Sequence, residues 1–561
     1  MKYRTFFSAA QLATVALLLC VTGCSFQSER VDLIVHNGVV VTLDSENTIA
    51  QAIAVDSGRV VAVGAERAVL NKYKAARTLD LRGGVLTPGL LDGHAHLVGY
   101  ADGLLEANLF GTSEWEEVVQ RVVVHQEEWP SEWAVGRGWD QNDWDSQAFP
   151  DRTLLDAAFP DQPVALERID GHAMVVNAEA LKRAGLLTGT VPDIEGGEVV
   201  IDASGTPTGV LVDNACSLVA ELIPPHPDQK RFEALMEAQA NLLAQGIVGI
   251  TDAGLPPAEI ERLDSLQRTG DLKLRINALV SASDENIEWL VDEGQRMTDR
   301  LVVNGVKFYM DGALGSRGAL LRQPYSDRTG WFGLATQREE TYQRQLETLL
   351  GHNLQAATHC IGDSATTFVL NVYAALLEGP NDRRWRIEHA QVVSTEDVRR
   401  FGDFSVIPSV QPTHATSDMY WAGERLGRNR IRRAYAYQEL LQALGMTALG
   451  TDFPVEDIDP RKTFAAAVAR MDADGFPVGG FQSENALTPE QALRGMTQWV
   501  ALAQFQENEL GTIEPGKWAD FTWMDRNWLE IDAQLARGTQ INGTCIAGEW
   551  CYLDSEINGL E

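Results

Sequence analysis

Short apolar runs separated by turn residues occupy both ends of the chain. Four runs between residues 33 and 63 are rich in valine, and β-branched residues in runs of this length favour β-strands. Runs of the same kind return over 519–524 and 540–552. We therefore predict one small β-sandwich domain that is built from both termini, over residues 32–86 and 505–555.

Between these ends, apolar strand-like runs alternate with longer helical patterns. Examples of such runs are residues 247–252, 274–279 and 303–308. Repeated alternation of this kind over a long span is typical of a (β/α)8 barrel, so we predict an α/β protein with a TIM-like barrel over 87–504. Residues from about 100 to 225 depart from the alternation and are rich in Trp, Asp and Gly. We interpret them as an insertion after the first barrel strand that covers the active-site mouth.

Composition limits the partners of the protein. The chain has 561 residues, 45% of them hydrophobic, and a formal net charge of −33. A chain of this length can bury a large core and should hold one large domain and a smaller one. Its acidity argues against nucleic acid as a partner, because nucleic-acid binding needs a basic surface.

The start of the chain has the pattern of an export signal. Two basic residues precede an apolar stretch over about 12–21, which is too short to span a membrane as a mature helix. The stretch closes with Val21-Thr22-Gly23-Cys24, which resembles a bacterial lipobox. The resemblance implies a lipoprotein signal peptide over 1–23, a lipidated Cys24 and a linker over 24–31.

A lipid on Cys24 would anchor the protein in the bacterial cell envelope. The next residue is Ser25 and not aspartate, which by resemblance to lipoprotein sorting implies the outer membrane, facing the periplasm. An ordinary signal peptide with a cysteine at this place by chance is the alternative.

Four cysteines remain after the lipobox, and two of them flank a turn near the end of the chain. Cys545 and Cys551 stand on either side of Ala547-Gly548-Glu549, a sequence that favours a hairpin. An exported protein permits disulfides. A bridge between the two cysteines and two free thiols are both open.

An apolar run near residue 90 ends in two histidines. His94 and His96 follow Leu90-Leu91-Asp92-Gly93, and side chains alternate along a strand, so the two imidazoles point to the same side. Two neutral imidazoles on one side form half of a transition-metal site. A pair of solvated histidines near a strand end is the alternative.

Further metal-competent residues stand where other strand-like runs end. Catalytic groups of a TIM barrel lie at the carboxyl ends of its strands. His359, His389 and Asp452 each close an apolar run, and Lys307 stands near the end of another. A single histidine at a strand end is more often structural. Together, in the order HxH, Lys, His, His, Asp, these residues indicate a metal site.

The sequence resembles the metal-dependent amidohydrolase superfamily. Within it, the sequence is most similar to amidohydrolase family 3, in the branch like N-substituted formamide deformylase. The resemblance covers nearly all of the chain after residue 30. The stretches that carry it are Thr87–His96, Gly171–Asn177, Val306–Gly312, His359–Asp363, Glu388–Gln391, Gln411–His414, Gly450–Val455 and Gly511–Asp520.

The resemblance implies a site with one or two zinc ions. The ligands that it implies are His94, His96, Lys307, His359, His389 and Asp452. Lys307 would bridge two metals as a CO2-derived carbamate, since a free ammonium has no lone pair to offer. The alternative is a lysine that forms an ion pair beside a single metal. Asp452 would take a proton from metal-activated water and pass it to the leaving amine.

Four other residues are candidate substrate contacts. The family motif implies that His172 reaches the pocket, although a polar role at a helix start is an alternative. Trp139 is a candidate substrate wall, or packs in a core. Asp311 either orients Lys307 or a substrate group, or caps a turn. His414 follows a strand-like run and either contacts the substrate or is structural.

These residues together predict a metal-dependent hydrolase of a small molecule. The resemblance implies cleavage of a non-peptide C–N bond, in an amide, a formamide or a cyclic amide. The same metals could also hydrolyse an ester, a lactone or a carbamate, because the metal site alone does not determine which bond is cleaved. A catalytically inactive lipoprotein that binds small molecules is the alternative of another class. A protein without catalytic function should, however, have accumulated a substitution in at least one of the six ligand positions. The oligomeric state is open, and a homodimer is only the base rate for such enzymes.

Overall fold

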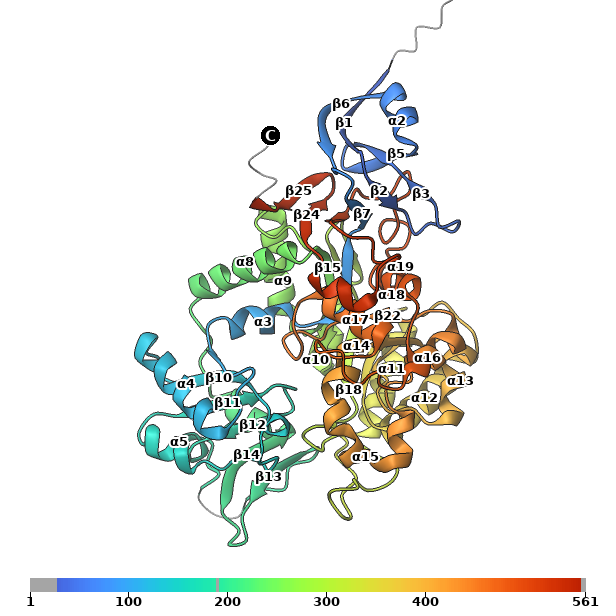
Figure 1. Cartoon of the computed structure of the whole chain (residues 1–561). Helices are drawn as coiled ribbons and strands as arrows, with labels where there is room; N and C mark the ends of the chain where they lie inside the picture. Colours follow the sequence, from blue (N-terminus) through green and yellow to red (C-terminus); the bar gives the residue numbers. More distant parts are fainter. Residues whose placement is uncertain (1–27, 188–190, 556–561) are drawn as a thin grey trace, which may run out of the picture.

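The computed structural model describes residues 28–187 and 191–555 of the chain (Figure 1). The predicted signal peptide over 1–23 and the predicted lipidation site, Cys24, lie outside these residues. Within the described part of the chain, no helix combines the length and the apolar character needed to cross a membrane.

Eight parallel strands form a nearly closed barrel, in which each strand pairs with the next one along the chain. From the first to the eighth, the strands are β8 (Leu90–Ala95), β15 (Ile247–Leu255), β16 (Arg275–Ser281), β18 (Leu301–Tyr309), β19 (Gln355–Cys360), β20 (Arg386–His389), β21 (Ile407–Val410) and β22 (Ala448–Leu449). In seven of these strands, every residue except Ser281 and Tyr309 is buried, as expected for parallel strands that are covered on both faces. The seven strands are β8, β16, β18, β19, β20, β21 and β22.

The first and last strands meet just beyond the end of β22. The backbone N–H of Asp452 donates to the carbonyl of His94 at 2.8 Å, and the N–H of His96 donates to the carbonyl of Phe453 at 2.9 Å. This approach requires glycine at position 450, where a Cβ atom would lie 2.5 Å from the backbone nitrogen of His94. The closure therefore brings two predicted ligand segments together.

Helices surround the barrel between its strands. Those along its outside are α8 (Asp228–Ala244), α9 (Pro257–Thr269), α10 (Asp284–Glu293), α11 (Glu339–Gly351), α12 (Asp363–Leu377), α13 (Thr395–Asp403), α16 (Tyr437–Leu444) and α17 (Pro460–Ala469). Near the carboxyl ends of the strands lie α3 (Leu97–Gly103), α14 (Pro412–Ser417), η3 (Asp418–Tyr420) and α15 (Ala422–Arg430). Two further helices, α18 (Pro489–Gly495) and α19 (Gln498–Ala503), follow α17.

A separate sheet lies between the first and second barrel strands in the sequence. Its order is β13-β14-β12-β11-β10-β9. The strands are β9 (Ala107–Asn108), β10 (Ala134–Trp139), β11 (Val164–Arg168), β12 (Ala173–Val176), β13 (Gly197–Ile201) and β14 (Pro207–Asp213). Helices α4 (Trp115–Glu128), α5 (Thr153–Ala158) and α6 (Ala178–Arg183) accompany it. The sheet and its helices enclose hydrophobic cores of their own.

Strands from both ends of the chain lie together at the far end of the molecule (Figure 1). One sheet has the order β5-β4-β1-β6 and the other the order β25-β24-β23-β7-β2-β3. The bounds are β1 (Glu29–His36), β2 (Val39–Val41), β3 (Ile49–Ala50), β4 (Ala52–Asp56), β5 (Arg59–Gly64), β6 (Tyr73–Asp80), β7 (Val85–Pro88), β23 (Phe521–Met524), β24 (Ile541–Ile546) and β25 (Glu549–Leu553). One apolar core contains Val55 from the first sheet and Phe521 from the second. The predicted barrel with an additional β-domain is therefore confirmed.

The two cysteines near the chain end remain separate thiols. Cys545 on β24 lies opposite Trp550 of β25, and not opposite Cys551. Cys545 is buried, Cys551 is partly exposed, and both are free. Hairpin register therefore settles the choice that the sequence left open, in favour of free thiols.

Candidate metal centre

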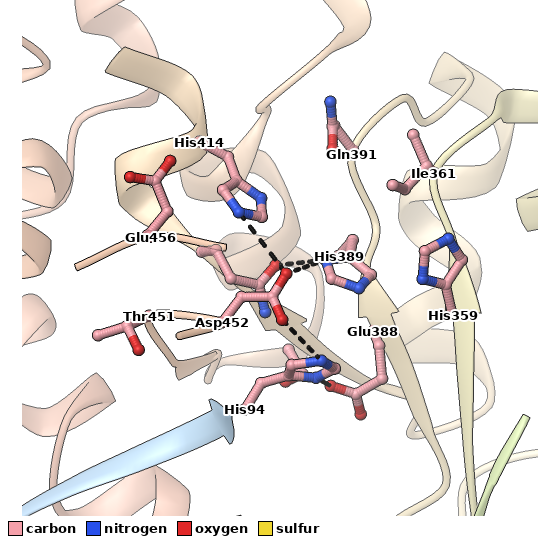
Figure 2. Close-up of polar contacts among 12 residues, drawn as sticks. His94, His359, Ile361, Glu388, His389, Gln391, His414, Thr451, Asp452 and Glu456 are labelled. Carbon is pink, nitrogen blue, oxygen red and sulfur yellow. Dashed lines mark hydrogen bonds and ion pairs between the residues drawn. The ribbon is translucent and has the colours of Figure 1, made fainter. Parts of the chain in front are cut away.

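The predicted ligands converge at the carboxyl ends of the barrel strands. Ligand atoms of His94, His389 and Asp452 all lie within 4.8 Å of one another, and all three residues are buried. The ring of His359 is centred 4.6 Å from that of His389. Figure 2 shows these four side chains pointing toward one space.

Two more predicted ligands contact this group. Nε2 of His96 lies 3.2 Å from Oδ1 of Asp452, and Nε2 of His94 lies 3.5 Å from the same oxygen. Nζ of Lys307 lies 3.4 Å from Nε2 of His94. The structure therefore brings all six sequence-predicted ligands to one site.

A buried carboxylate sets the orientation of His94. Nδ1 of His94 lies 2.5 Å from Oε2 of Glu388, and both side chains are fully buried. Nε of Arg386 contacts the other carboxylate oxygen at 2.6 Å. With its Nδ1–H held by Glu388, His94 turns Nε2 toward Asp452 as an acceptor, an arrangement typical of metal-binding histidines.

The other ligands are held by their own polar contacts. Nδ1 of His389 lies 2.8 Å from Oε1 of Gln411. Nε2 of His359 lies 3.4 Å from the carbonyl of Gly312. The carboxylate of Asp92 accepts from the hydroxyl of Thr451 at 2.7 Å and from the backbone N–H of His94 at 3.1 Å. Asp92 therefore ties the first ligand strand to the segment that carries Asp452.

Unusual backbone at two ligands aims their side chains. His389 has φ +68° and Asp452 has φ +65°, a region that residues other than glycine seldom adopt and that is common at functional sites. Glu388 and His389 are neighbours on β20, and regular alternation would send them to opposite faces. The left-handed conformation of His389 lets both side chains reach the site.

Burial keeps the imidazoles neutral. It lowers the pKa of His94 to about 4, with a further contribution from the charge of Lys307. Burial also holds the pKa values of His359 and His389 well below their usual range. Neutral imidazoles carry the free lone pairs that a metal needs.

The pKa values of Lys307 and Asp452 are both lowered, for different reasons. Burial lowers the pKa of Lys307 to about 8, so that a fraction of the amine is neutral near physiological pH. Burial alone would raise the pKa of Asp452, but the close contact with His96 holds it well below its usual value. Asp452 is therefore an anion.

This donor set fits a divalent transition metal. Oδ1 of Asp452 is buried and accepts no hydrogen bond from the described residues, although two imidazole nitrogens face it within 3.5 Å. Lone pairs that converge in this way repel one another unless a cation lies between them. Neutral imidazoles with a carboxylate are the ligands that zinc prefers.

Two of the four candidate substrate contacts lie at the cavity, and two lie elsewhere. His172 and His414 line the cavity above the ligands. Nδ1 of His172 pairs with Oδ1 of Asp213 at 2.7 Å, and the ring of His172 lies 5.0 Å from that of His359. Nε2 of His414 lies 3.7 Å from Oδ2 of Asp452.

Trp139 and Asp311 do not line the cavity, and the prediction that they contact the substrate is corrected. Trp139 is fully buried in the core of the inserted sheet, where its indole N–H donates to the carbonyl of Leu166 at 2.8 Å. The carboxylate of Asp311 accepts backbone N–H bonds from Ile361 and Gly362 at 3.0 and 2.7 Å. Asp311 thus fixes the loop behind His359.

Three residues to which the sequence pattern assigned no role complete the site. Glu388, Gln411 and Asp92 orient the ligands through their contacts with His94 and His389. All three lie inside stretches that carry the family resemblance or next to a predicted ligand. Their signal was a polar residue inside a buried strand, as for Asp92 and Glu388, or directly after one, as for Gln411.

Comparison with known proteins agrees with this geometry. A sequence model of the amidohydrolase family matches residues 77–552, so the chain belongs to the amidohydrolase family. It is 30% identical over 528 residues to the putative amidohydrolase YtcJ of Bacillus subtilis, covering 92% of this chain and 98% of that protein. It is 27% identical over 542 residues to the N-substituted formamide deformylase of Arthrobacter pascens, covering 93% of this chain and 98% of that protein.

A solved structure has the same fold over most of its length. It is an uncharacterized metal-dependent hydrolase from Pyrococcus horikoshii OT3, with 27% sequence identity and a TM-score of 0.72. The match covers 89% of this chain and 99% of that chain.

Proposed function

We propose that this protein is a metal-dependent hydrolase that cleaves a non-peptide C–N bond of a small molecule, in an amide, a formamide or a cyclic amide. The observation that carries the proposal is the convergence of His94, His389 and Asp452 within 4.8 Å in a buried site. The membership of the amidohydrolase family and the metal-dependent hydrolase of the same fold support it. The deformylase relative supports C–N cleavage in particular.

The six ligands divide into two groups. His94, His96 and Asp452 would hold a first zinc ion, and His359 with His389 would hold a second. Lys307 would serve as a ligand to both in the form of a carbamate, produced when its neutral amine adds CO2 and releases a proton to solvent. The lowered pKa of Lys307, about 8 because of burial, supports this reaction, since only the unprotonated amine has a lone pair.

The residues of the chain then move the protons. When bound, the metal ions would lower the pKa of a water molecule to about 7 and polarise the substrate carbonyl. Asp452, an anion in this site, would accept the proton of the attacking water. It would then deliver that proton to the leaving nitrogen as the C–N bond breaks.

Metal removal tests this function. We expect the protein to hydrolyse at least one member of a panel of N-formyl amines, N-acyl amino acids and lactones. A chelator should abolish that hydrolysis, and added Zn²⁺ should restore it, because Asp452 alone cannot produce a nucleophile at neutral pH. Hydrolysis of lactones alone would contradict C–N cleavage, and hydrolysis that survives the complete loss of metal would contradict the metal mechanism.

We also propose that the protein acts from the outer membrane, facing the periplasm, through a lipid on Cys24. The support is the sequence Val21-Thr22-Gly23-Cys24 followed by Ser25. Cell fractionation tests it: the protein should sediment with membranes, and a Cys24→Ser variant should not receive lipid. Recovery of the unchanged protein in the soluble periplasmic fraction would contradict the anchor.

A further inference from the structure

The cavity above the metal ligands is strongly acidic. It has a volume of about 540 Å³ and is lined by ten aspartate and glutamate side chains, against two arginines and Lys307. An enclosed charge costs free energy unless it has a partner. The carboxylates that lack a cationic partner therefore indicate the charge of the ligand that this cavity binds.

Five of the ten carboxylates are paired with arginine. Arg168, with a side chain only 1% exposed, is held between Asp140 and Asp170. Arg137 pairs with Glu167 at 2.9 Å, and two more carboxylates at the rim pair with Arg231. Two others are accounted for by the metal centre. Asp452 is one of its ligands, and Asp252 lies near the ligand His96.

The remaining three carboxylates have no arginine or lysine within ion-pair distance among the described residues. They are Asp143 from η1 (Gln141–Asp143), Asp418 from η3, and Glu456 from the segment after β22. Asp418 and Glu456 are partly buried, and Asp143 is the most exposed of the three. Asp418 accepts from the hydroxyl of Tyr435 at 2.7 Å, and Glu456 accepts from the hydroxyl of Ser417 at 2.6 Å. Neutral donors of this kind fill lone pairs but do not offset the charge.

The charge of Glu456 raises the cost of ionising the other two carboxylates. Burial raises the pKa of Asp418 to about 7, and the charge of Glu456 adds to the shift. Burial and the charge of Asp140 raise the pKa of Asp143 to about 6, and Glu456 again contributes. A cation in the cavity would relieve this repulsion.

A buried imidazole near Asp418 and Glu456 also lacks a partner. His414 is 8% exposed and lines the same cavity. Its Nε2 makes no hydrogen bond within the described part of the chain, and Oδ2 of Asp452, at 3.7 Å, is too far away to accept one. A buried polar atom that lacks a partner at an active site is an indication of a group that a ligand supplies. Figure 2 shows the carboxylate of Glu456 beside the His414 ring, on the side away from His359.

We propose that Asp143, Asp418 and Glu456, together with His414, form a subsite for a positively charged group of the substrate, an ammonium or a guanidinium. The inference rests on the proposed function and names its substrate class: an amide that carries a cation. Glu456 lies on one side of the His414 ring, and Nε2 of His414 is 3.7 Å from Oδ2 of Asp452, so the cation would bind near the scissile C–N bond. Charge-assisted hydrogen bonds to the carboxylates would hold it.

Two substrates of equal length test the subsite. N-formyl-1,4-diaminobutane carries a terminal ammonium, and N-formylpentylamine carries a methyl group in its place. We expect the wild-type holoenzyme to have a kcat/KM about 10- to 100-fold higher for the cationic substrate, the range expected for hydrogen bonds to charged groups. The variants Asp143→Asn and Glu456→Gln should each reduce this preference, measured as the ratio of the two kcat/KM values. The matched controls Asp161→Asn and Glu285→Gln remove exposed carboxylates outside the cavity and should keep the full preference.

Binding without turnover separates this inference from the proposed function. Calorimetry on the metal-loaded Asp452→Asn protein should show the same preference for the cationic compound, whether or not the wild type hydrolyses either one. Equal binding of the two compounds, or a preference that survives the double variant Asp143→Asn with Glu456→Gln, would overturn the subsite. Equal hydrolysis of both compounds by the wild type would overturn it and leave the proposed function intact.

Discussion

The Asp452→Asn variant is expected to lose about 10²- to 10⁴-fold in kcat/KM, the usual contribution of a positioned general acid and base. The carboxylate of Asp452 faces the ligand nitrogens of two histidines, with Oδ1 3.2 Å from Nε2 of His96 and 3.5 Å from Nε2 of His94. An amide in its place cannot accept the proton of the attacking water or deliver it to the leaving nitrogen. Steady-state kinetics with the best substrate of the panel, on protein of known metal content, measure the effect.

The metal content of the Asp452→Asn protein decides how its loss of activity is interpreted. The five other ligands remain, so we expect the Asp452→Asn protein to bind metal, although more weakly. The Asp161→Asn variant, which changes an exposed aspartate of the inserted region, controls for the change of side chain and should keep full activity. Undiminished hydrolysis by a fully metal-loaded Asp452→Asn protein would contradict the assignment of Asp452.

The His94→Ala variant is expected to lose metal and hydrolysis together. His94 is fully buried and contributes Nε2 to the centre, while Glu388 holds its Nδ1 at 2.5 Å. Removal of the imidazole deletes one ligand and leaves Glu388 with Arg386 alone. Elemental analysis and kinetics on the same preparation should show both losses, with circular dichroism confirming that the protein is folded.

A graded variant distinguishes metal loss from general damage at this site. Glu388→Gln keeps the shape of the side chain but removes the charge that orients His94. We expect its metal affinity to fall about 10- to 100-fold, as for other partners of metal-binding histidines, and excess Zn²⁺ should restore its activity. Rescue of His94→Ala to full activity by the same Zn²⁺ concentration would show that His94 is not a ligand.

The barrel and the ligand set were predictable because their signals are local. Alternation of apolar strands with helices indicates the fold, and parallel strands all place their carboxyl ends at one face. His94, His359 and His389 each stand at such an end. Residue types with free lone pairs at these positions indicate a metal site before any distance is known.

The contacts that aim the ligands were not predictable, because they depend on backbone conformation and on packing. The positive φ of His389 cannot be derived from a strand pattern, which would have turned Glu388 away from the site. Trp139 and Asp311 carry suitable chemistry but face a core and a loop, and only packing separates these places from the cavity. The cluster of Asp143, Asp418 and Glu456 comes from three distant segments that meet only in the folded chain.

The most direct test of the metal centre is a titration of metal-free protein with Zn²⁺, in which bound metal per chain and hydrolysis are measured at every point. We predict that activity rises in proportion to bound metal and reaches its maximum at one or two ions per chain, and that the His94→Ala protein shows neither binding nor activity over the same range. Full hydrolysis by wild-type protein that holds less than about 0.1 ion per chain would contradict the metal mechanism, since the centre could then not be the source of the nucleophile.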